Sequence, residues 1–316
     1  MKLSVIVPCY NEEKNIELFY ETLIKDLSVF LSDMEIVFIN DGSSDRTIEA
    51  IKSIYDASPY SIKIINFSRN FGKEAALLAG LEASEGDYVS IIDADLQQRP
   101  MYIKKMVEFL DVNEYFDSVA MIQEERKESQ LLIFLKNSFY SLINKLTEVE
   151  LKPSASDFRT LRRPVVETII SLPERCRFSK GIFAWVGFNT HFEPYKVEDR
   201  VHGSSKWSFW KLFAYALDGI TAFSTTPLII SSILGIVLCL ISFIFIIAIV
   251  IKTLIWGDPV AGFPTLATLI LFAMGIQLVS VGILGQYIAK TYTEVKERPH
   301  YIIKNKFGFE RKKGDK

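Results

Sequence analysis

Two long runs without a charged side chain constrain this fold more than any other feature of the chain. Residues 228–251 are rich in isoleucine and leucine, and residues 263–288 contain only Gln277 and Gln286 as strongly polar side chains. Each run is long enough to cross the hydrocarbon core of a bilayer, which takes about 20 apolar residues. The alternative is a pair of buried core helices, which uninterrupted apolar runs of this length disfavour. We therefore expect a transmembrane hairpin at 228–288.

Basic residues predict on which side of the membrane the rest of the chain lies. The short loop between the two runs carries only Lys252, whereas the segment 289–316 carries nine lysines and arginines. By the positive-inside rule, the large N-terminal part and this basic tail face the cytoplasm. The predicted location is the inner (cytoplasmic) membrane, crossed twice, with both termini cytoplasmic. The net charge of −2 gives no case for a nucleic-acid partner.

The first part of the chain alternates short apolar strands with amphipathic helices. The expected strands are residues 3–7, 35–39, 62–67 and 88–92, and the expected helices are residues 15–30, 45–55, 73–83 and 102–110. A βαβ series of this kind predicts an α/β fold with a mostly parallel, Rossmann-like sheet and helices on both faces.

Two aromatic, amphipathic stretches separate this part from the hairpin. Residues 131–146 carry leucines and phenylalanines with Lys136 and Lys145 among them, and residues 206–223 include Trp207 and Trp210. Such helices are typical of the membrane interface, although ordinary core packing is the alternative. The predicted division is a nucleotide-binding core at 1–130, an acceptor and interface region at 131–227, the hairpin at 228–288, and a basic cytoplasmic tail at 289–316.

The strongest chemical signal is Asp93-Ala94-Asp95, which follows the expected strand 88–92. Two acids there cannot be unpaired core residues, because burying a carboxylate without a partner is too costly. Ligands usually bind at the carboxyl ends of strands in open α/β sheets. Mg²⁺ takes one or two carboxylates together with substrate phosphates. The motif therefore suggests a metal that carries a diphosphate, although Asp-x-Asp alone also occurs in solvated loops.

Three other strand ends carry polar, turn-forming residues. They are the segments Pro8-Cys9-Tyr10-Asn11-Glu12-Glu13, Asn40-Asp41-Gly42-Ser43-Ser44-Asp45 and Arg69-Asn70-Phe71-Gly72-Lys73-Glu74. Tyr10 offers a ring on which a base can rest, and Asp41 can accept a hydrogen bond from a ribose or a base. Asp45 also suits a plain helix N-cap. Four consecutive strand ends of this kind would line one edge of the sheet.

These motifs together resemble those of the family 2 glycosyltransferases with the GT-A fold, especially the polyprenyl-phosphate glycosyltransferases. This group includes dolichol-phosphate mannose synthase and the bactoprenol glucosyltransferases. The segments 156–159, 177–181 and 200–207 match as well, and the resemblance continues through the hairpin to about residue 299. The ordered set is far more specific than any single motif.

The resemblance implies a role for each matching residue. Those implied to bind the nucleotide sugar are Pro8, Tyr10, Glu12, Asp41, Lys73, Asp93, Asp95, Arg200 and Lys206. The implied ligands of Mg²⁺ or Mn²⁺ are Asp93, Asp95 and Gln97, and the implied catalytic residues are Asp157, as base, and Asp95. Those implied to meet an acceptor phosphate are Arg126, Arg159 and Arg177.

Two features leave open the role of Asp157 and the choice of residues that meet the acceptor phosphate. A lipid phosphate has a second pKa of about 6 and hardly needs a base near neutral pH, so Asp157 could instead orient Arg159 or stabilise positive charge at the sugar carbon. The segment 123–127 offers only Arg126 and Lys127 where relatives place several arginines.

The expected reaction is inverting transfer of a hexose, with UDP-glucose favoured, to undecaprenyl or another polyprenyl phosphate. GDP-mannose or a UDP-aminosugar is the alternative donor, and a non-catalytic, nucleotide-sugar-binding membrane protein is the alternative class. The small-residue pairs Ser231/Gly235 and Gly285/Ala289 would allow close helix contact in a homo-oligomer.

Overall fold

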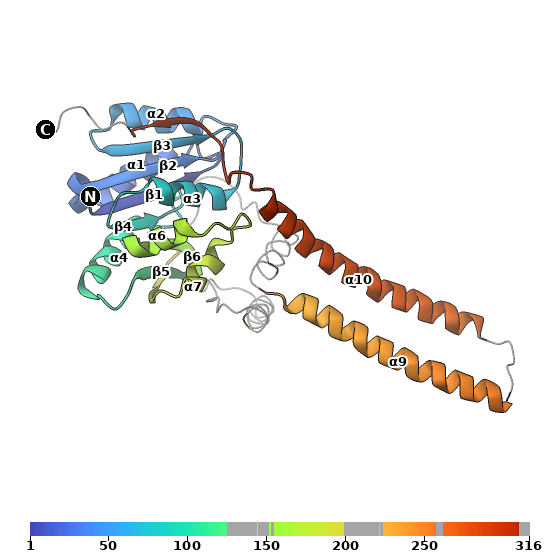
Figure 1. Cartoon of the computed structure of the whole chain (residues 1–316). Coiled ribbons are helices and arrows are strands. Elements are labelled where there is room, and N and C mark those ends of the chain that lie inside the picture. Colours follow the sequence, from blue (N-terminus) through green and yellow to red (C-terminus); the bar gives the residue numbers. More distant parts are fainter. Residues whose placement is uncertain are drawn as a thin grey trace.

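The structure is a computed structural model, and it describes residues 1–124, 144, 152, 155–198, 221, 224–256 and 262–309. Figure 1 shows a domain built on one sheet, from which two long helices project side by side. The two predicted interface stretches, 131–146 and 206–223, lie outside the described residues except for Asn144 and Thr221.

The described residues form a sheet of eight strands in the order β7-β5-β6-β4-β1-β2-β3-β8. The strands are β1 (Leu3–Cys9), β2 (Met34–Asn40), β3 (Ser61–Phe67), β4 (Tyr88–Ile91), β5 (Ser118–Gln123), β6 (Ala155–Arg162), β7 (Thr190–Tyr195) and β8 (Ile303–Phe307). Strands β4, β1, β2 and β3 run parallel, which confirms the predicted α/β sheet.

Helices cover both faces of the sheet. They are α1 (Ile16–Asp26), α2 (Thr47–Ala57), α3 (Lys73–Ala83), α4 (Met101–Val112), α6 (Arg163–Ser171) and α7 (Ser179–Trp185). Along β1 the side chains alternate, so Val5 and Val7 pack with α1, α2 and α4, while Ile6 packs with α3, α6 and α7. The predicted helix 73–83 is confirmed, whereas the predicted helix 15–30 ends at Asp26 and a 3₁₀ helix, Ser28–Asp33, follows.

Strand β6 brings a distant segment to the ligand edge of the sheet. It pairs antiparallel with β4, with Ile91 opposite Arg159. The start of β6 therefore lies beside the end of β4. Continued by two residues, the same register places Asp93, just after β4, beside Asp157 in β6.

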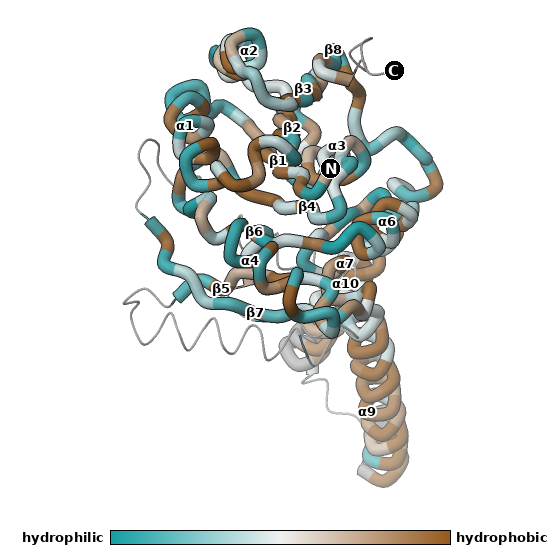
Figure 2. Tube along the Cα trace, turned by 90° about the vertical axis from the view of Figure 1, so that its left-hand side faces the viewer, coloured by the Kyte–Doolittle hydropathy of each residue, from teal (hydrophilic) through white to brown (hydrophobic). Residues whose placement is uncertain are grey.

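Two helices project from the domain, α9 (Thr226–Trp256) and α10 (Phe263–Val295). They contain the predicted spans, and both include a window long and apolar enough to cross a membrane, Thr226–Phe245 and Phe272–Val295. None of either window is buried inside the protein. Figure 2 shows the hydrophobic colouring along α9.

The segment after residue 288, predicted as a basic tail, has a structural role that the prediction missed. Helix α10 continues to Val295, and the chain then returns to the sheet as β8, antiparallel to β3. Tyr301 stacks on Phe67 with ring centroids 4.8 Å apart. The sequence of β8, Ile-Lys-Asn-Lys-Phe, hid this strand because it lacks an apolar run.

Candidate active site

The candidate site lies where β1, β2 and β4 end and β6 begins. The predicted donor-side residues that the structure describes lie at or just after strand ends: Pro8 near the end of β1, Tyr10 and Glu12 after it, Asp41 after β2, and Asp93, Asp95 and Gln97 after β4. Lys73 starts α3, the helix that follows β3. The topology therefore brings together motifs that are far apart in the sequence.

Lys73, the first residue of α3, lies between two carboxylates at the centre of this edge. Its Nζ is 2.8 Å from Asp93 Oδ1 and 3.1 Å from Asp157 Oδ2. Burial acts to lower the pKa of Lys73, but Asp93 and Asp157 outweigh it, so the pKa is raised and the ammonium stays charged. One cation thus joins the predicted metal motif to the predicted base.

The Asp93-Ala94-Asp95 turn is held in shape by its own backbone and by Gln98. Asp95 Oδ1 accepts the backbone N–H of Gln97 at 3.1 Å. The Gln98 side chain accepts the N–H of Asp93 at 3.0 Å and donates to Asp93 Oδ2 and to Ser156 Oγ, each at 3.3 Å. Gln98 is buried and was not predicted as a site residue; no sequence signal beyond its position after the motif pointed to it.

The donor set at this turn fits a hard divalent cation. Asp93 and Asp95 offer carboxylate oxygens, Gln97 offers an amide, and a monovalent cation, Lys73, already stands against Asp93. No group of three or more His, Cys, Asp or Glu side chains that could hold a metal occurs in the part of the chain that the structure describes. Substrate oxygens would therefore have to complete the coordination, as is usual for Mg²⁺ in nucleotide sites.

The loops after β1 and β2 are tied to each other beside Tyr10. The backbone N–H of Asn11, at φ +56°, donates to Ser43 Oγ, and Asn11 Oδ1 accepts the N–H of Ser44. The N–H of Glu12 donates to Thr47 Oγ1 at 2.8 Å. This bracing leaves the Tyr10 side chain 41% exposed, as a platform for a base requires.

Asp41 braces the next loop. Its two carboxylate oxygens accept the backbone N–H groups of Phe71 and Gly72 at 2.7 and 2.9 Å. Burial raises the pKa of Asp41, partly offset by these two N–H groups. Asp41 therefore positions the loop that leads into α3, and its predicted contact with a ribose or base remains a prediction.

Asp157 and Arg159 point from the start of β6 into a group of positive charges. Burial acts to raise the pKa of Asp157, but Lys73, Lys180 and Arg159 outweigh it and hold the pKa below its usual value. Arg159 is buried, its guanidinium lies 3.7 Å from the centre of the Phe183 ring, and its Nη2 donates to the Ser156 carbonyl. Lys180 lies in the matching segment 177–181, but the resemblance implied no role for it.

The structure places Arg177 differently from Arg159. Its two terminal nitrogens donate to the carbonyls of Leu172 and Ile169, at the carboxyl end of α6. These bonds give Arg177 a part in shaping the α6–α7 loop, and its phosphate contact stays a prediction. The remaining predicted residues, Arg126, Arg200 and Lys206, lie outside the described residues.

Glu74, directly after Lys73, reaches across to α7. Its Oε2 accepts the backbone N–H of Ser179 at 2.9 Å and also the Ser179 hydroxyl. Burial raises the pKa of Glu74, and the bonds from Ser179 act against that rise. The contact fixes the start of α7, and hence Lys180, against the helix that carries Lys73.

Comparison with known proteins shows the family to which the chain belongs. Residues 4–170 match the model of glycosyl transferase family 2. The chain is 40% identical to the uncharacterized glycosyltransferase sll0501 of Synechocystis sp., covering 98% of this chain and 97% of the relative. It is 42% identical to the bactoprenol glucosyl transferase of Shigella phage SfV, covering 96% of this chain and 99% of the relative.

A solved structure is similar at lower identity. It is the crystal structure of glucosyl-3-phosphoglycerate synthase from Mycobacterium tuberculosis in complex with Mn²⁺, uridine diphosphate and phosphoglyceric acid, 22% identical, with a TM-score of 0.48 and coverage of 70% of this chain and 76% of that chain. The family match spans more than half of the 316 residues, and the relatives are matched over nearly their whole length. The chain is therefore a glycosyltransferase and belongs to glycosyl transferase family 2.

Proposed function

We propose that this enzyme transfers a hexose, with inversion, from a nucleotide sugar to a polyprenyl phosphate, with UDP-glucose and undecaprenyl phosphate as the favoured pair. The observation that carries the proposal is the combination, in one chain, of the charged strand-end site with two exposed apolar helices. The full-length similarity to a bactoprenol glucosyl transferase supports the same acceptor.

The proposed reaction is a single displacement. A phosphate oxygen of the acceptor forms a bond to the anomeric carbon, and the bond from that carbon to the nucleoside diphosphate breaks with its electron pair. Negative charge therefore gathers on the leaving diphosphate. Fixed positive charge aimed at that position is the largest form of catalysis open to such a site.

The chain's own residues divide this work. Tyr10 and the braced loops after β1 and β2 hold the nucleoside, and Lys73 supplies a fixed cation next to the diphosphate. Asp93 and Asp95, with Gln97, would hold Mg²⁺ or Mn²⁺, which supplies positive charge to the diphosphate when bound. Arg200 and Lys206 are proposed to meet the same diphosphate.

Asp157 is a poor candidate for an obligatory base. Its ion pair with Lys73 and the lowered pKa favour a carboxylate that holds charged neighbours in place. An acceptor phosphate that is already ionised needs no proton removed. We propose that Asp157 keeps Lys73 and Arg159 in position and stabilises positive charge at the sugar carbon.

The apolar hairpin explains how such an enzyme meets a lipid. Helix α9 has 31 residues and α10 has 33, which at about 1.5 Å per residue makes each longer than the roughly 30 Å hydrocarbon core. We propose that both cross the cytoplasmic membrane, with the catalytic domain and both termini on the cytoplasmic side. The lipid tail of the acceptor would lie in the same bilayer.

The test is transfer of labelled sugar from a panel of UDP- and GDP-sugars to undecaprenyl phosphate, with purified protein and Mg²⁺ or Mn²⁺. Metal-dependent label in the lipid fraction from one donor, lost in Asp95→Asn, is the expected result and names the sugar. GDP-mannose or a UDP-aminosugar as the sole active donor would change the sugar but keep the reaction. Binding of nucleotide sugar without transfer to any lipid phosphate would overturn the proposal in favour of a binding role.

A further inference from the structure

Beyond the predicted residues, we infer that Lys180 receives the acceptor's phosphate together with Arg159, and that Glu74 positions Lys180 for this contact. The inference rests on the proposed function and adds a residue to its acceptor side. It starts from two cations near Asp157, Arg159 and Lys180, whose hydrogen-bonding capacity is not fully used.

Arg159 is the first of these cations. It is only 5% exposed, yet among the described residues its Nε has no hydrogen-bond partner. A buried guanidinium with an unused donor is costly, because each such group loses its hydration without replacement. An anion that entered beside Arg159 would remove that cost.

Lys180 is the second. No hydrogen bond or ion pair to its ammonium occurs among the residues that the structure describes, although Asp157 lies close enough to act on it. Burial lowers the pKa of Lys180, and Lys73 and Arg159 act in the same direction. The geometry agrees, because Arg159 stacks on Phe183, three residues after Lys180 on α7, and so brings a second cation against the same helix.

The balance of charge around Arg159 and Lys180 differs from that around Lys73. Lys73 has Asp93 and Asp157 within ion-pair distance. Among the described residues, Asp157 is the carboxylate that acts on both Arg159 and Lys180, and Glu74 acts more weakly on Lys180. A phosphate dianion beside Arg159 and Lys180 would restore neutrality, whereas the Asp93 carboxylate of the metal motif is paired with Lys73.

The segment that leads into Lys180 is hydrogen-bonded to α10, the second helix of the proposed membrane anchor. Near the domain end of α10, the Glu294 carboxylate accepts the backbone N–H groups of Arg175 and Cys176 at 2.8 to 3.0 Å. Lys180 follows four residues after Cys176, and Glu74 holds Ser179 between them. These contacts link the segment that leads into Lys180 to a helix of the proposed membrane anchor, and the acceptor's lipid tail would lie in the same bilayer.

The test measures steady-state kinetics for Lys180→Ala with the acceptor and the donor varied separately. Loss of one charge-assisted hydrogen bond should raise the KM for undecaprenyl phosphate about ten- to a hundredfold. The KM for the nucleotide sugar and the Kd for UDP should stay within about twofold of the wild type. Lys180→Arg should restore most of the acceptor affinity, since a guanidinium also binds phosphate.

Two controls keep the result interpretable. Lys104→Ala, on the exposed face of α4 where Lys104 pairs with Glu108, should leave both KM values unchanged. Glu74→Gln should raise the acceptor KM less than Lys180→Ala, with UDP binding intact. An unchanged acceptor KM in Lys180→Ala, or a rise in the donor KM instead, would overturn the inference, whereas a wild-type protein that transfers no sugar would count against the proposed function itself.

Discussion

Lys63 and Lys73 lie at opposite ends of the same sheet, and each stands between two carboxylates, yet their surroundings differ. Lys63 Nζ is 2.9 Å from Glu35 and 2.7 Å from Glu85, and its side chain is 7% exposed. Lys73 Nζ is 2.8 Å from Asp93 and 3.1 Å from Asp157, and its side chain is 43% exposed. The first lysine is enclosed by protein, whereas the second faces the space where substrate would bind.

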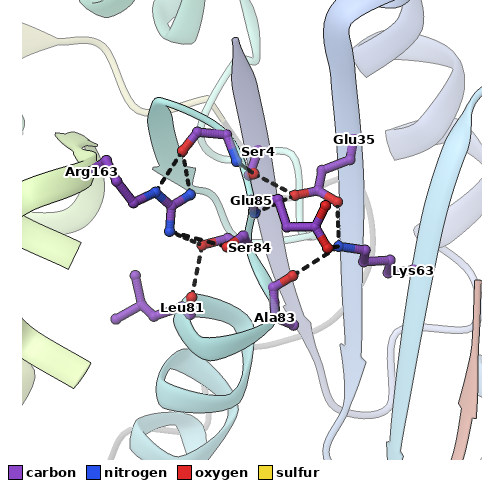
Figure 3. A network of polar contacts seen from close by, with 9 residues as sticks. Ser4, Glu35, Lys63, Leu81, Ala83, Ser84, Glu85 and Arg163 are labelled. Carbon is purple, nitrogen blue, oxygen red and sulfur yellow. Dashed lines mark hydrogen bonds and ion pairs between the residues drawn. The ribbon is translucent and has the colours of Figure 1, made fainter. Parts of the chain in front are cut away.

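The charged groups around Lys63 form a network of hydrogen bonds and ion pairs (Figure 3). Glu35 accepts from the Ser4 hydroxyl and the Glu85 N–H, Lys63 donates to the Ala83 carbonyl, and Arg163 donates to the carbonyls of Ser84 and Gly86. Positive charge near the carboxyl end of α3 also suits the helix dipole. Helix α3 is thus anchored at one end and presents Lys73 and Glu74 at the other.

The largest expected effect comes from Lys63→Met. Removing one partner of a buried ion pair leaves Glu35 uncompensated, which costs about 3 to 5 kcal/mol of stability. Thermal unfolding of the detergent-solubilised protein should show the loss as a lower Tm, while turnover per folded molecule stays near that of the wild type. A Tm within a degree or so of the wild type would show that this network does not anchor α3.

Lys73→Met should have the opposite result, with a large loss of activity and a small change in stability. Transfer should fall about a hundredfold or more, because a fixed cation beside the leaving group is lost. Stability should change by about 1 kcal/mol or less, since the side chain is half-exposed. Mn²⁺ titration without nucleotide should show tighter binding, because Asp93 no longer holds an ammonium. Weaker Mn²⁺ binding would contradict the assignment of Asp93 as a metal ligand.

Gly42→Ala tests how the loops beside the candidate active site are supported. Gly42 has φ +61°, and an added Cβ would lie 2.2 Å from the carbonyl carbon of Arg69. The strain should cost about 1 to 3 kcal/mol and raise the KM for the nucleotide sugar by displacing the loop that Asp41 braces. Gly72→Ala is the matched control, with φ +96° but no atom within 4 Å of the added Cβ. Equal effects of the two variants would rule out the backbone contact as the cause.

The smallest effect is expected from Asp157→Asn on the pH dependence of transfer. A carboxyl with a lowered pKa contributes stability above its unfolded pKa of about 3.9 and loses it only as the pH falls through the lower folded value. Asp157 therefore stays ionised between about pH 5 and 8. The acid limb should instead follow the acceptor phosphate, near pH 6, and should persist in Asp157→Asn. Its disappearance in profiles of kcat/KM would restore Asp157 as a base.

Local patterns predicted the parallel half of the fold well. Apolar runs and turn residues identified β1 to β4, and the helix 73–83 matches α3 residue for residue. These elements are specified by neighbours in sequence, so their periodicity is visible without the tertiary structure. The strand ends that carry Tyr10, Asp41 and Asp93 followed directly from them.

Contacts between distant segments were the part that the sequence did not reveal. Strand β6 is rich in polar residues, so its pairing with β4, which brings Asp157 to Lys73, has no local signature. Gln98 and the Glu74–Ser179 contact depend on the same long-range pairing. The resemblance supplied Asp157 and Arg159 as candidates, but only the structure supplies their partners.

The return of the chain as β8 has a consequence for how the protein is made. Strand β3 ends at Phe67 and β8 begins at Ile303, 236 residues later (303 minus 67). At a synthesis rate of about 5 to 20 residues per second, the edge of β3 waits roughly 10 to 50 seconds for its partner. An unpaired edge strand invites pairing with other chains. In the proposed membrane topology, the nascent hairpin therefore enters the bilayer before the sheet is complete, and a ribosome that stalls within the hairpin would leave β3 as an unpaired, aggregation-prone edge.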